Sequence, residues 1–147
     1  MTFDLKDRRI YGFATEEHLR FADQDVNGHV NNGAFLELLE SARVAYLRGF
    51  VRLGLPRFRM VIGRIETDFR RQMFYPGRAT ACARLVEVHE RKCVIGQALF
   101  DGEGHCTATQ RVIMVSLNEE THRSTPFEPA VRGALERFAA SPDGLIA

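Results

Sequence analysis

The side chains best suited to chemistry are concentrated in residues 23–32, which read DQDVNGHVNN. This short segment carries two carboxylates, one imidazole and several amides. A hydrolytic site needs a base or nucleophile, a group that orients it, and donors for a developing oxyanion. The segment leads into a predicted helix, whose free N-terminal N–H groups can act as those donors. Asp25 and His29 are therefore the leading candidates for catalytic groups.

A structural explanation competes with this interpretation, because Asp and Asn favour turns and helix caps through local bonds to the backbone. We prefer the structural explanation for Asp23, Asn31 and Asn32 when each is taken singly. For Asp25 together with His29 we prefer a catalytic role.

A calcium loop is a second alternative for the same segment. Asp23, Asp25, Asn27 and Gly28 match positions one, three, five and six of an EF-hand loop. The bidentate Glu expected at position twelve is replaced by Ala34, and the preceding residues alternate like a strand rather than a helix. We therefore predict no metal site here.

The elements that position this segment follow from hydrophobic spacing. Residues 16–21 are predicted to form a short strand, and residues 22–33 a turn or loop. The next residues are predicted to form the one long helix, with Asn31 or Asn32 as its N-terminal cap and Gly49 at its end. Arg43 is predicted to lie outside the apolar side of this helix. The apolar side of that helix consists of Phe35, Leu38, Leu39, Ala42 and Tyr46.

Downstream of the helix the hydrophobic period changes to two, which is typical of half-buried strands. Ile65, Thr67 and Phe69 alternate with polar residues in the first of these strands. Three more strands at residues 79–88, 92–100 and 105–117 form an antiparallel meander, and residues 129–140 form a small terminal helix. These elements predict an α+β hotdog fold, a five-stranded antiparallel sheet wrapped around one long central helix.

Composition limits the remaining possibilities. A chain of 147 residues with 45% hydrophobic residues is predicted to be a single domain spanning residues 1–147. Its formal charge of +1 argues against nucleic acid or an anionic membrane as a partner. The three cysteines form neither a CxxC pair nor a cluster with histidine, and each is expected to be a free, buried residue. Because no signal-like or membrane-spanning apolar run is present, we expect a cytoplasmic protein.

The motif itself resembles a known family. The stretch FADQDVNGHVNNGAFLELLESARVAYL, residues 21–47, resembles the 4-hydroxybenzoyl-CoA thioesterase-like hotdog family. Its DxDxNxHVNN core is similar to that of acyl-ACP thioesterases. The similarity continues in IETDFRRQMFYPG, residues 65–77, and more loosely in residues 116–129.

The resemblance implies roles for five residues. Asp25 corresponds to the carboxylate that these enzymes use as nucleophile or general base, while Asn27 and His29 correspond to groups that position carboxylate, water or substrate. Asn32 lies where family members offer a helix N–H to the thioester carbonyl. Asp68 resembles a Glu of a similar segment, although an ordinary solvent-facing strand carboxylate explains it equally well.

The implied reaction is hydrolysis of an acyl-CoA or acyl-ACP without a cofactor. A thioester is electrophilic and its thiolate leaves readily, so one carboxylate and helix N–H donors suffice, and the serine-hydrolase motif GxSxG is absent. The alternatives are a hotdog dehydratase and a non-catalytic acyl-thioester binding protein.

Arginines near the predicted groove are candidates for binding the phosphates of the substrate. Because 18 of the 20 basic residues are arginine, an ordinary solvated surface is the competing explanation. The leading candidates are Arg64, Arg70 and Arg71, with Arg57 and Arg59 as further ones. One helix covers too little of a five-stranded sheet, so we expect a homodimer or a homotetramer.

Overall fold

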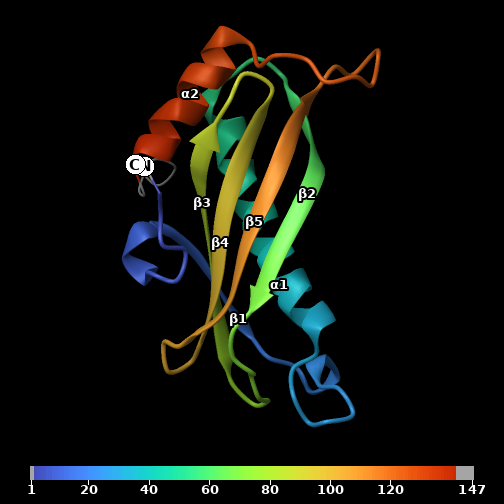
Figure 1. Cartoon of the computed structure of the whole chain (residues 1–147), viewed down its shortest axis with the longest axis vertical. Coiled ribbons are helices and arrows are strands. Elements are labelled where there is room, and N and C mark those ends of the chain that lie inside the picture. The colour runs from blue at the N-terminus through green and yellow to red at the C-terminus, as the bar shows by residue number, and fades with distance from the viewer. Residues whose placement is uncertain (1, 142–147) are drawn as a thin grey trace.

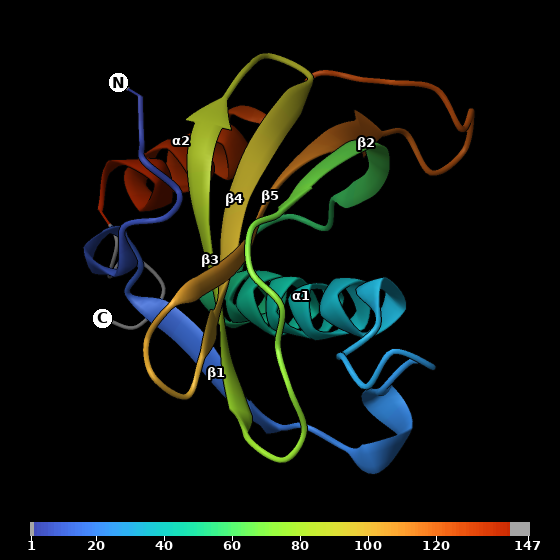
Figure 2. The same cartoon turned by 60° about the horizontal axis from the view of Figure 1, so that its bottom comes forward.

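The computed structural model describes residues 2–141, in which an antiparallel sheet curls around helix α1 (Figures 1 and 2). The five strands lie in the order β1-β3-β4-β5-β2. The predicted α+β hotdog fold is confirmed. The strands are β1 (Phe13–His18), β2 (Arg59–Phe69), β3 (Arg78–Val88), β4 (Lys92–Asp101) and β5 (Cys106–Leu117), and the helices are α1 (Asn32–Arg48) and α2 (Pro129–Ala140).

Helix α1 begins directly after its N-terminal cap residue. Asn31 is the cap, because its side-chain oxygen accepts a hydrogen bond of 2.8 Å from the backbone N of Ala34, and Asn32 is the first helical residue. The α-helix ends before Gly49, as predicted, but Gly49 keeps a right-handed helical conformation and begins a 3-10 helix that continues to Leu53. The side facing the sheet is apolar over most of its length, with Phe35, Leu39, Ala42 and Tyr46 buried.

One residue on that side contradicts the hydrophobic pattern. Arg43 was predicted to lie away from the apolar side of α1, but only 4% of it is exposed. Its Nη1 donates hydrogen bonds of 3.1 Å to the side-chain oxygens of Gln97 on β4 and Gln110 on β5. The prediction failed because the spacing pattern treats every arginine as a surface residue and contains no information about acceptors on distant strands.

The first strand was also misplaced. It was predicted at residues 16–21, but β1 ends at His18 and the chain then forms a 3-10 turn at Phe21–Asp23. Arg20 and Asp23 stabilise that turn through mutual hydrogen bonds, which compete successfully with strand pairing.

The meander of β3, β4 and β5 is confirmed, whereas β2 pairs with β5 at the far edge of the sheet. We call the side of the sheet toward α1 its inner face. Phe69 of β2 lies on the inner face, because its ring packs edge-on against Phe35 of α1 at 5.6 Å. Alternation then places Asp68 on the outer face, away from α1.

The outer face is partly covered by the N-terminal segment. A Cβ atom at Gly96 of β4 would lie 2.6 Å from Cδ2 of Leu5, so only glycine allows this segment to pack so closely. Tyr11 is buried in the same region, and its hydroxyl donates to the carbonyl of Leu5 at 2.7 Å.

All three cysteines are free and lie in strands, and Cys82 and Cys93 are buried as predicted, whereas Cys106 is only half-buried. Burial raises the pKa of Cys82 to about 11 and that of Cys93 to about 12. Neither of the described helices has the length and apolar character needed to cross a membrane.

Candidate active site

The predicted catalytic segment is a tight turn at the N-terminal end of α1 (Figure 1). The backbone N of Asp25 donates to the carbonyl of His29 at 2.8 Å, and the N of Gly28 donates back to the carbonyl of Asp25 at 3.1 Å. Gly28 has a φ of +78°, which favours glycine. The turn is fixed to the loop after β2, because the N of Val30 donates to the carbonyl of Met73 at 2.9 Å.

This turn holds the Asp25 carboxylate by one oxygen. Oδ1 accepts hydrogen bonds from the backbone N of Asn27 at 2.8 Å and of His29 at 3.3 Å. Within residues 2–141 no group donates to Oδ2, and the side chain is exposed. Asp25 therefore stabilises its turn through Oδ1 and keeps Oδ2 free for chemistry.

Asp23 has different surroundings. Only 5% of it is exposed, and its carboxylate accepts bonds from the backbone N of Arg20 at 2.7 Å and from the guanidinium of Arg20 at 2.8 Å. Burial raises the pKa of Asp23, but the bonds from Arg20 outweigh burial and hold that pKa below its usual value. Both carboxylate oxygens are used, which supports the structural role expected for this residue.

A surface pocket of about 250 Å³ brings several of the predicted residues together. Asp25, His29 and Asn32 line it on one side, and Arg70 and Arg71 line it on the other. Its remaining wall consists of Val30, Phe35, Phe69 and Gln72. We call this the turn pocket.

The first turn of α1 supplies donors beside this pocket. Among the described residues, no acceptor pairs with the backbone N–H groups of Asn32 and Gly33. Helix N-termini carry a partial positive charge, so these two groups are suited to stabilise an oxyanion.

The imidazole of His29 is positioned by a residue that the sequence analysis missed. The ring packs edge-on against the ring of Phe74 at 5.3 Å, and His29 is half-buried as a result. Phe74 belongs to the segment whose family resemblance was noted, but the pattern assigned it no role. Its function in the site depends on the loop after β2 meeting the catalytic turn.

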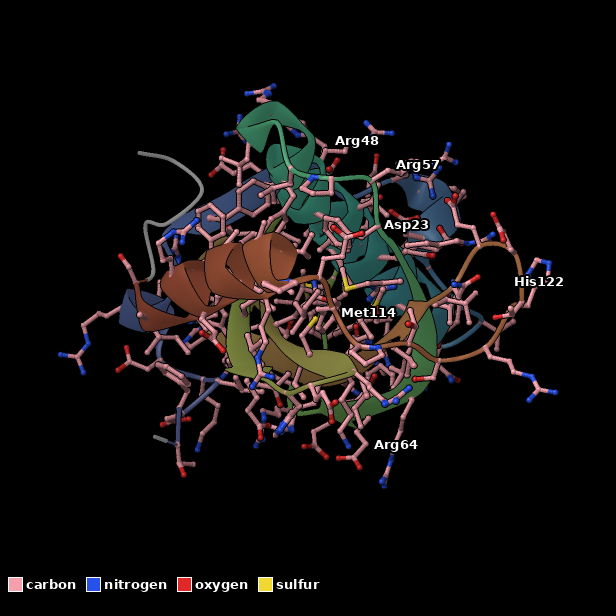
Figure 3. All side chains as sticks on the ribbon, turned by 90° about the horizontal axis from the view of Figure 1, so that it is seen from above. Asp23, Arg48, Arg57, Arg64, Met114 and His122 are labelled. Atoms are coloured by element: carbon pink, nitrogen blue, oxygen red, sulfur yellow. The ribbon has the colours of Figure 1, made fainter. Side chains whose placement is uncertain are left out.

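Other predicted residues lie outside the turn pocket. Asn27 is exposed at the tip of the turn. Asp68 lies on the outer face, where Nη2 of Arg70 approaches its carboxylate at 3.5 Å. Arg64 forms an ion pair with Glu66, and Figure 3 shows it extending into solvent on the side of the sheet away from α1. One copy of the chain therefore does not bring Asp68 or Arg64 to Asp25, and in the described structure the only hydrogen bond from Asn27 to Asp25 comes from its backbone N.

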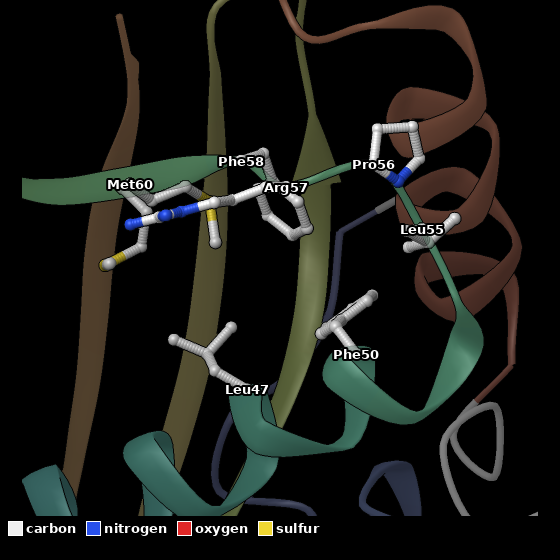
Figure 4. A pocket seen from close by; sticks show the side chains of 8 residues that line it. Leu47, Phe50, Leu55, Pro56, Arg57, Phe58 and Met60 are labelled. Atoms are coloured by element: carbon white, nitrogen blue, oxygen red, sulfur yellow. The ribbon is translucent and has the colours of Figure 1, made fainter. Parts of the chain in front are cut away.

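Arg57 borders a second, apolar pocket of about 420 Å³ (Figure 4). The guanidinium of Arg57 is exposed and pairs with Glu119 at 3.1 Å. This distal pocket lies at the C-terminal end of α1, a helix of 17 residues and thus about 25 Å long, opposite the turn pocket. Its wall consists of Leu47, Phe50, Leu55, Pro56, Arg57, Phe58, Met60 and Met114.

The calcium alternative finds no support in the geometry of the turn. Asp23 is turned toward Arg20, while Asp25 binds backbone N–H groups of its own turn. Within the described part of the chain, no three His, Cys, Asp or Glu side chains gather closely enough to hold a metal ion.

Thioesterases are among the known proteins that this chain resembles in sequence and structure. The chain is 25% identical over 128 residues to the long-chain acyl-CoA thioesterase FadM of Escherichia coli (strain K12), a match that covers 84% of this chain and 97% of FadM. A predicted thioesterase from Bacillus stearothermophilus has a similar structure, with a TM-score of 0.77, 27% identity, and coverage of 88% of this chain and 98% of its own.

A thioesterase from Thermus thermophilus, solved with coenzyme A and Zn, shares the fold at a TM-score of 0.72 and 24% identity, with coverage of 84% and 96% of the two chains. A family model, that of the thioesterase-like superfamily, matches residues 19–135. Because this match includes the turn, α1, the whole meander and most of α2, the chain belongs to the thioesterase-like superfamily.

Proposed function

We propose that this protein hydrolyses an acyl-CoA to the free acid and coenzyme A, with Asp25 as nucleophile or general base. The observation that carries the proposal is the turn pocket. It combines the unpaired Oδ2 of Asp25 with the unpaired N–H groups at the start of α1. Membership of the thioesterase-like superfamily supports thioester hydrolysis as the reaction type.

In the proposed reaction the thioester carbonyl oxygen lies against the N–H groups of Asn32 and Gly33. Either Oδ2 of Asp25 attacks the carbonyl carbon and the thiolate leaves, after which water hydrolyses the acyl-aspartyl anhydride, or Asp25 takes a proton from water that attacks directly. Both routes give one acid and one thiol, and His29 can pass the proton onward.

Isotope labelling can establish the nucleophilic route. After many turnovers in ¹⁸O water, anhydride hydrolysis at Cγ of Asp25 exchanges oxygen into the Asp25 carboxylate, and mass spectrometry of the peptide containing residue 25 detects it. An unlabelled peptide, with all the label in the released acid, is the result expected both for the general-base route and for an anhydride hydrolysed at its acyl carbon.

Arg70 and Arg71 are the residues proposed to bind the phosphates of the carrier. Both are exposed and line the turn pocket, where a charged ligand remains partly hydrated. The guanidinium of Arg70 is already partly occupied, because its Nε donates to Oγ1 of Thr109 at 3.0 Å and its Nη2 lies 3.5 Å from the carboxylate of Asp68. A protein with coenzyme A bound shares this fold, which supports CoA over acyl carrier protein as the carrier.

We further propose a long aliphatic acyl group. The exposed Ile62, Ile65 and Phe69 of β2 form an apolar path beside α1, between the turn pocket and the distal pocket. A chain that reaches the distal pocket along this path must be long, because α1 separates the two pockets by most of its length. The relative FadM is a long-chain acyl-CoA thioesterase.

A panel of acyl-CoAs tests the proposal. The protein is supplied with acetyl-, octanoyl-, palmitoyl- and benzoyl-CoA, and thiol release is followed with a colorimetric thiol reagent. We expect hydrolysis with the highest kcat/KM for palmitoyl-CoA. Failure to hydrolyse any of these, with tight binding of palmitoyl-CoA in calorimetry, would instead indicate a non-catalytic binding protein.

A further inference from the structure

The buried Arg43 has no function in the reaction described above. Its Nη1 donates hydrogen bonds of 3.1 Å to the side-chain oxygens of Gln97 and Gln110. The amide of Gln97 donates onward to the carbonyl of Leu39 at 2.7 Å. The amide of Gln110 donates to the hydroxyl of Thr67 at 2.9 Å. This network therefore crosses the inner face of the sheet from α1 to the edge strand β2, and it fixes only Nη1 of the guanidinium.

The remaining donors of the guanidinium have no close acceptor. Among residues 2–141, nothing accepts a hydrogen bond from Nε or Nη2, and the nearest carboxylate, that of Glu40, lies 3.9 Å from Nη2. The Glu40 side chain is 64% exposed, so water screens its charge. Burial lowers the pKa of Arg43, because the cation loses its solvation. A buried cation with unused donors favours the binding of an anion.

Arg43 lies beside the proposed acyl path. Phe35, Leu39 and Arg43 are spaced four residues apart on α1, so they form one row along the helix. Phe35 lines the turn pocket and contacts Phe69 of β2, so this row leads away from the turn pocket. Thr67, two residues before Phe69, lies on the same inner face of β2 and belongs to the Arg43 network. A polar cluster therefore interrupts the apolar path.

The position of Arg43 on α1 sets the length of chain that can reach it. Arg43 follows Asn32 by 11 residues, which correspond to about 16 Å along the helix. An extended chain advances roughly 1.2 Å per bond, so the group that meets Arg43 lies about 13 bonds from the thioester carbon. A carboxylate at that point accepts hydrogen bonds from the unused donors and balances their charge, whereas a methyl group does neither.

We propose that Arg43 binds a carboxylate at the far end of the acyl chain, so that the protein prefers dicarboxylic acyl-CoAs of this length over fatty acyl-CoAs of equal length. This inference rests on the proposed function and names a substrate class for the same site. Arg43 acts as a specificity residue, because it contacts the distal end of the substrate and not the thioester.

Two substrates of equal length test this preference. Tetradecanedioyl-CoA and myristoyl-CoA differ only in the group about 13 bonds from the thioester carbon, which is a carboxylate in the first and a methyl group in the second. We call the ratio of their kcat/KM values, measured by thiol release, the carboxylate preference. We expect it to be about tenfold for the wild type, because charge-assisted hydrogen bonds form in a buried site. A ratio of one or less overturns the proposal.

Removal of the cation tests the assignment to Arg43. Arg43→Met removes the charge and the donors, and the carboxylate preference should fall tenfold or more, mainly through a higher KM for tetradecanedioyl-CoA. Arg48→Met makes the same change on an exposed residue at the end of the same helix, and the preference should stay at its wild-type value. Equal preferences in these two variants would assign the effect to a residue other than Arg43.

A second pair of variants serves if Arg43→Met does not fold. Glu40→Gln and Glu37→Gln each remove an exposed carboxylate of α1 that lies 3.9 Å from an arginine. The carboxylate of Glu40 competes with that of the substrate for Arg43, so Glu40→Gln should raise the carboxylate preference about threefold. Glu37→Gln should leave it unchanged, and an equal effect of both substitutions would contradict the proposal.

Hydrolysis of myristoyl-CoA reports on the proposed function separately. If both substrates are hydrolysed without a preference for tetradecanedioyl-CoA, this inference fails and the proposed function stands. If neither is hydrolysed, the proposed function fails, and calorimetry with the same two thioesters measures the preference as a ratio of Kd values. Tighter binding of tetradecanedioyl-CoA that is lost in Arg43→Met would still support the carboxylate site, and equal binding would overturn it.

Discussion

Asp23 and Asp25 lie two residues apart in one turn and differ in what their carboxylates bind. Asp23 is buried, and Arg20 occupies both of its oxygens. Asp25 is exposed, and only backbone N–H groups occupy one oxygen. The first arrangement stabilises the turn, and the second leaves an oxygen free for chemistry.

The first prediction concerns stability and its dependence on pH. Asp23→Asn should lower the free energy of unfolding at pH 7 by about 1–3 kcal/mol, because a buried charge-assisted bond to Arg20 is lost. The folded-state pKa of Asp23 lies below the ordinary value for an aspartate, which the unfolded chain retains. Its stabilisation is therefore present above that ordinary value and is lost as the pH falls through the lower folded pKa.

Thermal unfolding of wild type and Asp23→Asn at pH 7 and near pH 3 checks this prediction. The difference in Tm should shrink at the lower pH. A difference that stays constant over this range would show that Asp23 acts through packing rather than through its charge.

At the residue scale, the local sequence predicted that Asp25 and His29 lie in the turn before α1 and limited the cap to Asn31 or Asn32, because a turn followed by a helix is encoded locally. Phe74 and Arg43 were beyond prediction for the opposite reason. Phe74 meets His29 only once the loop after β2 reaches the turn, and Arg43 is tolerated in the interior only because two glutamines from other strands face it.

At the scale of elements, Arg84 of β3 joins three segments that the sequence separates. Only 3% of it is exposed, and its guanidinium donates to the carbonyls of Ile10 at 2.8 Å and of Ala139 at 2.7 Å. Ala139 lies in the last turn of α2, where unpaired carbonyls and the helix dipole favour a cation. The N-terminal segment and α2 are therefore both anchored to the sheet by one residue.

Arg84→Met should reduce the free energy of unfolding by roughly 2–4 kcal/mol, because two partly buried carbonyls lose a charged donor that is itself buried. Urea denaturation measures this loss, and hydrogen exchange should become faster in α2 than in α1. Arg132→Met is the control, since Arg132 is exposed and pairs with Glu136 on the surface of α2, and its effect should stay below about 0.5 kcal/mol. Equal effects of the two substitutions would contradict the anchoring role.

The distal pocket gives a second prediction at this scale. Leu55→Trp adds bulk to the pocket wall and should lower kcat/KM for palmitoyl-CoA about tenfold, while kcat/KM for octanoyl-CoA stays nearly unchanged. The reason is that a few methylene groups of the longer chain no longer fit into the pocket, and their binding contributes roughly 1–3 kcal/mol. Leu53→Trp, on an exposed residue outside the pocket wall, is the control. A uniform loss for both substrates would argue against acyl binding there.

At the scale of the whole molecule, periodicity predicted the elements well but their arrangement only in part. The alternation in β2 to β5 and the helical spacing in α1 and α2 are properties of neighbouring residues, so the sequence reveals them directly. The pairing of β2 with β5 is not a property of neighbouring residues, because it joins residues up to about 58 positions apart, such as Arg59 and Leu117. The hydrophobic pattern therefore does not predict it. The family resemblance supplied this missing part by implying the hotdog fold.

The central claim is that the Asp25 carboxylate performs the chemistry of thioester hydrolysis. The most direct measurement is kcat of Asp25→Asn with saturating palmitoyl-CoA, followed by thiol release, with KM and Tm determined on the same protein. We expect kcat to fall on the order of a hundredfold or more, with little change in KM and a Tm close to that of the wild type. Turnover near the wild-type rate in a folded Asp25→Asn protein would contradict the account.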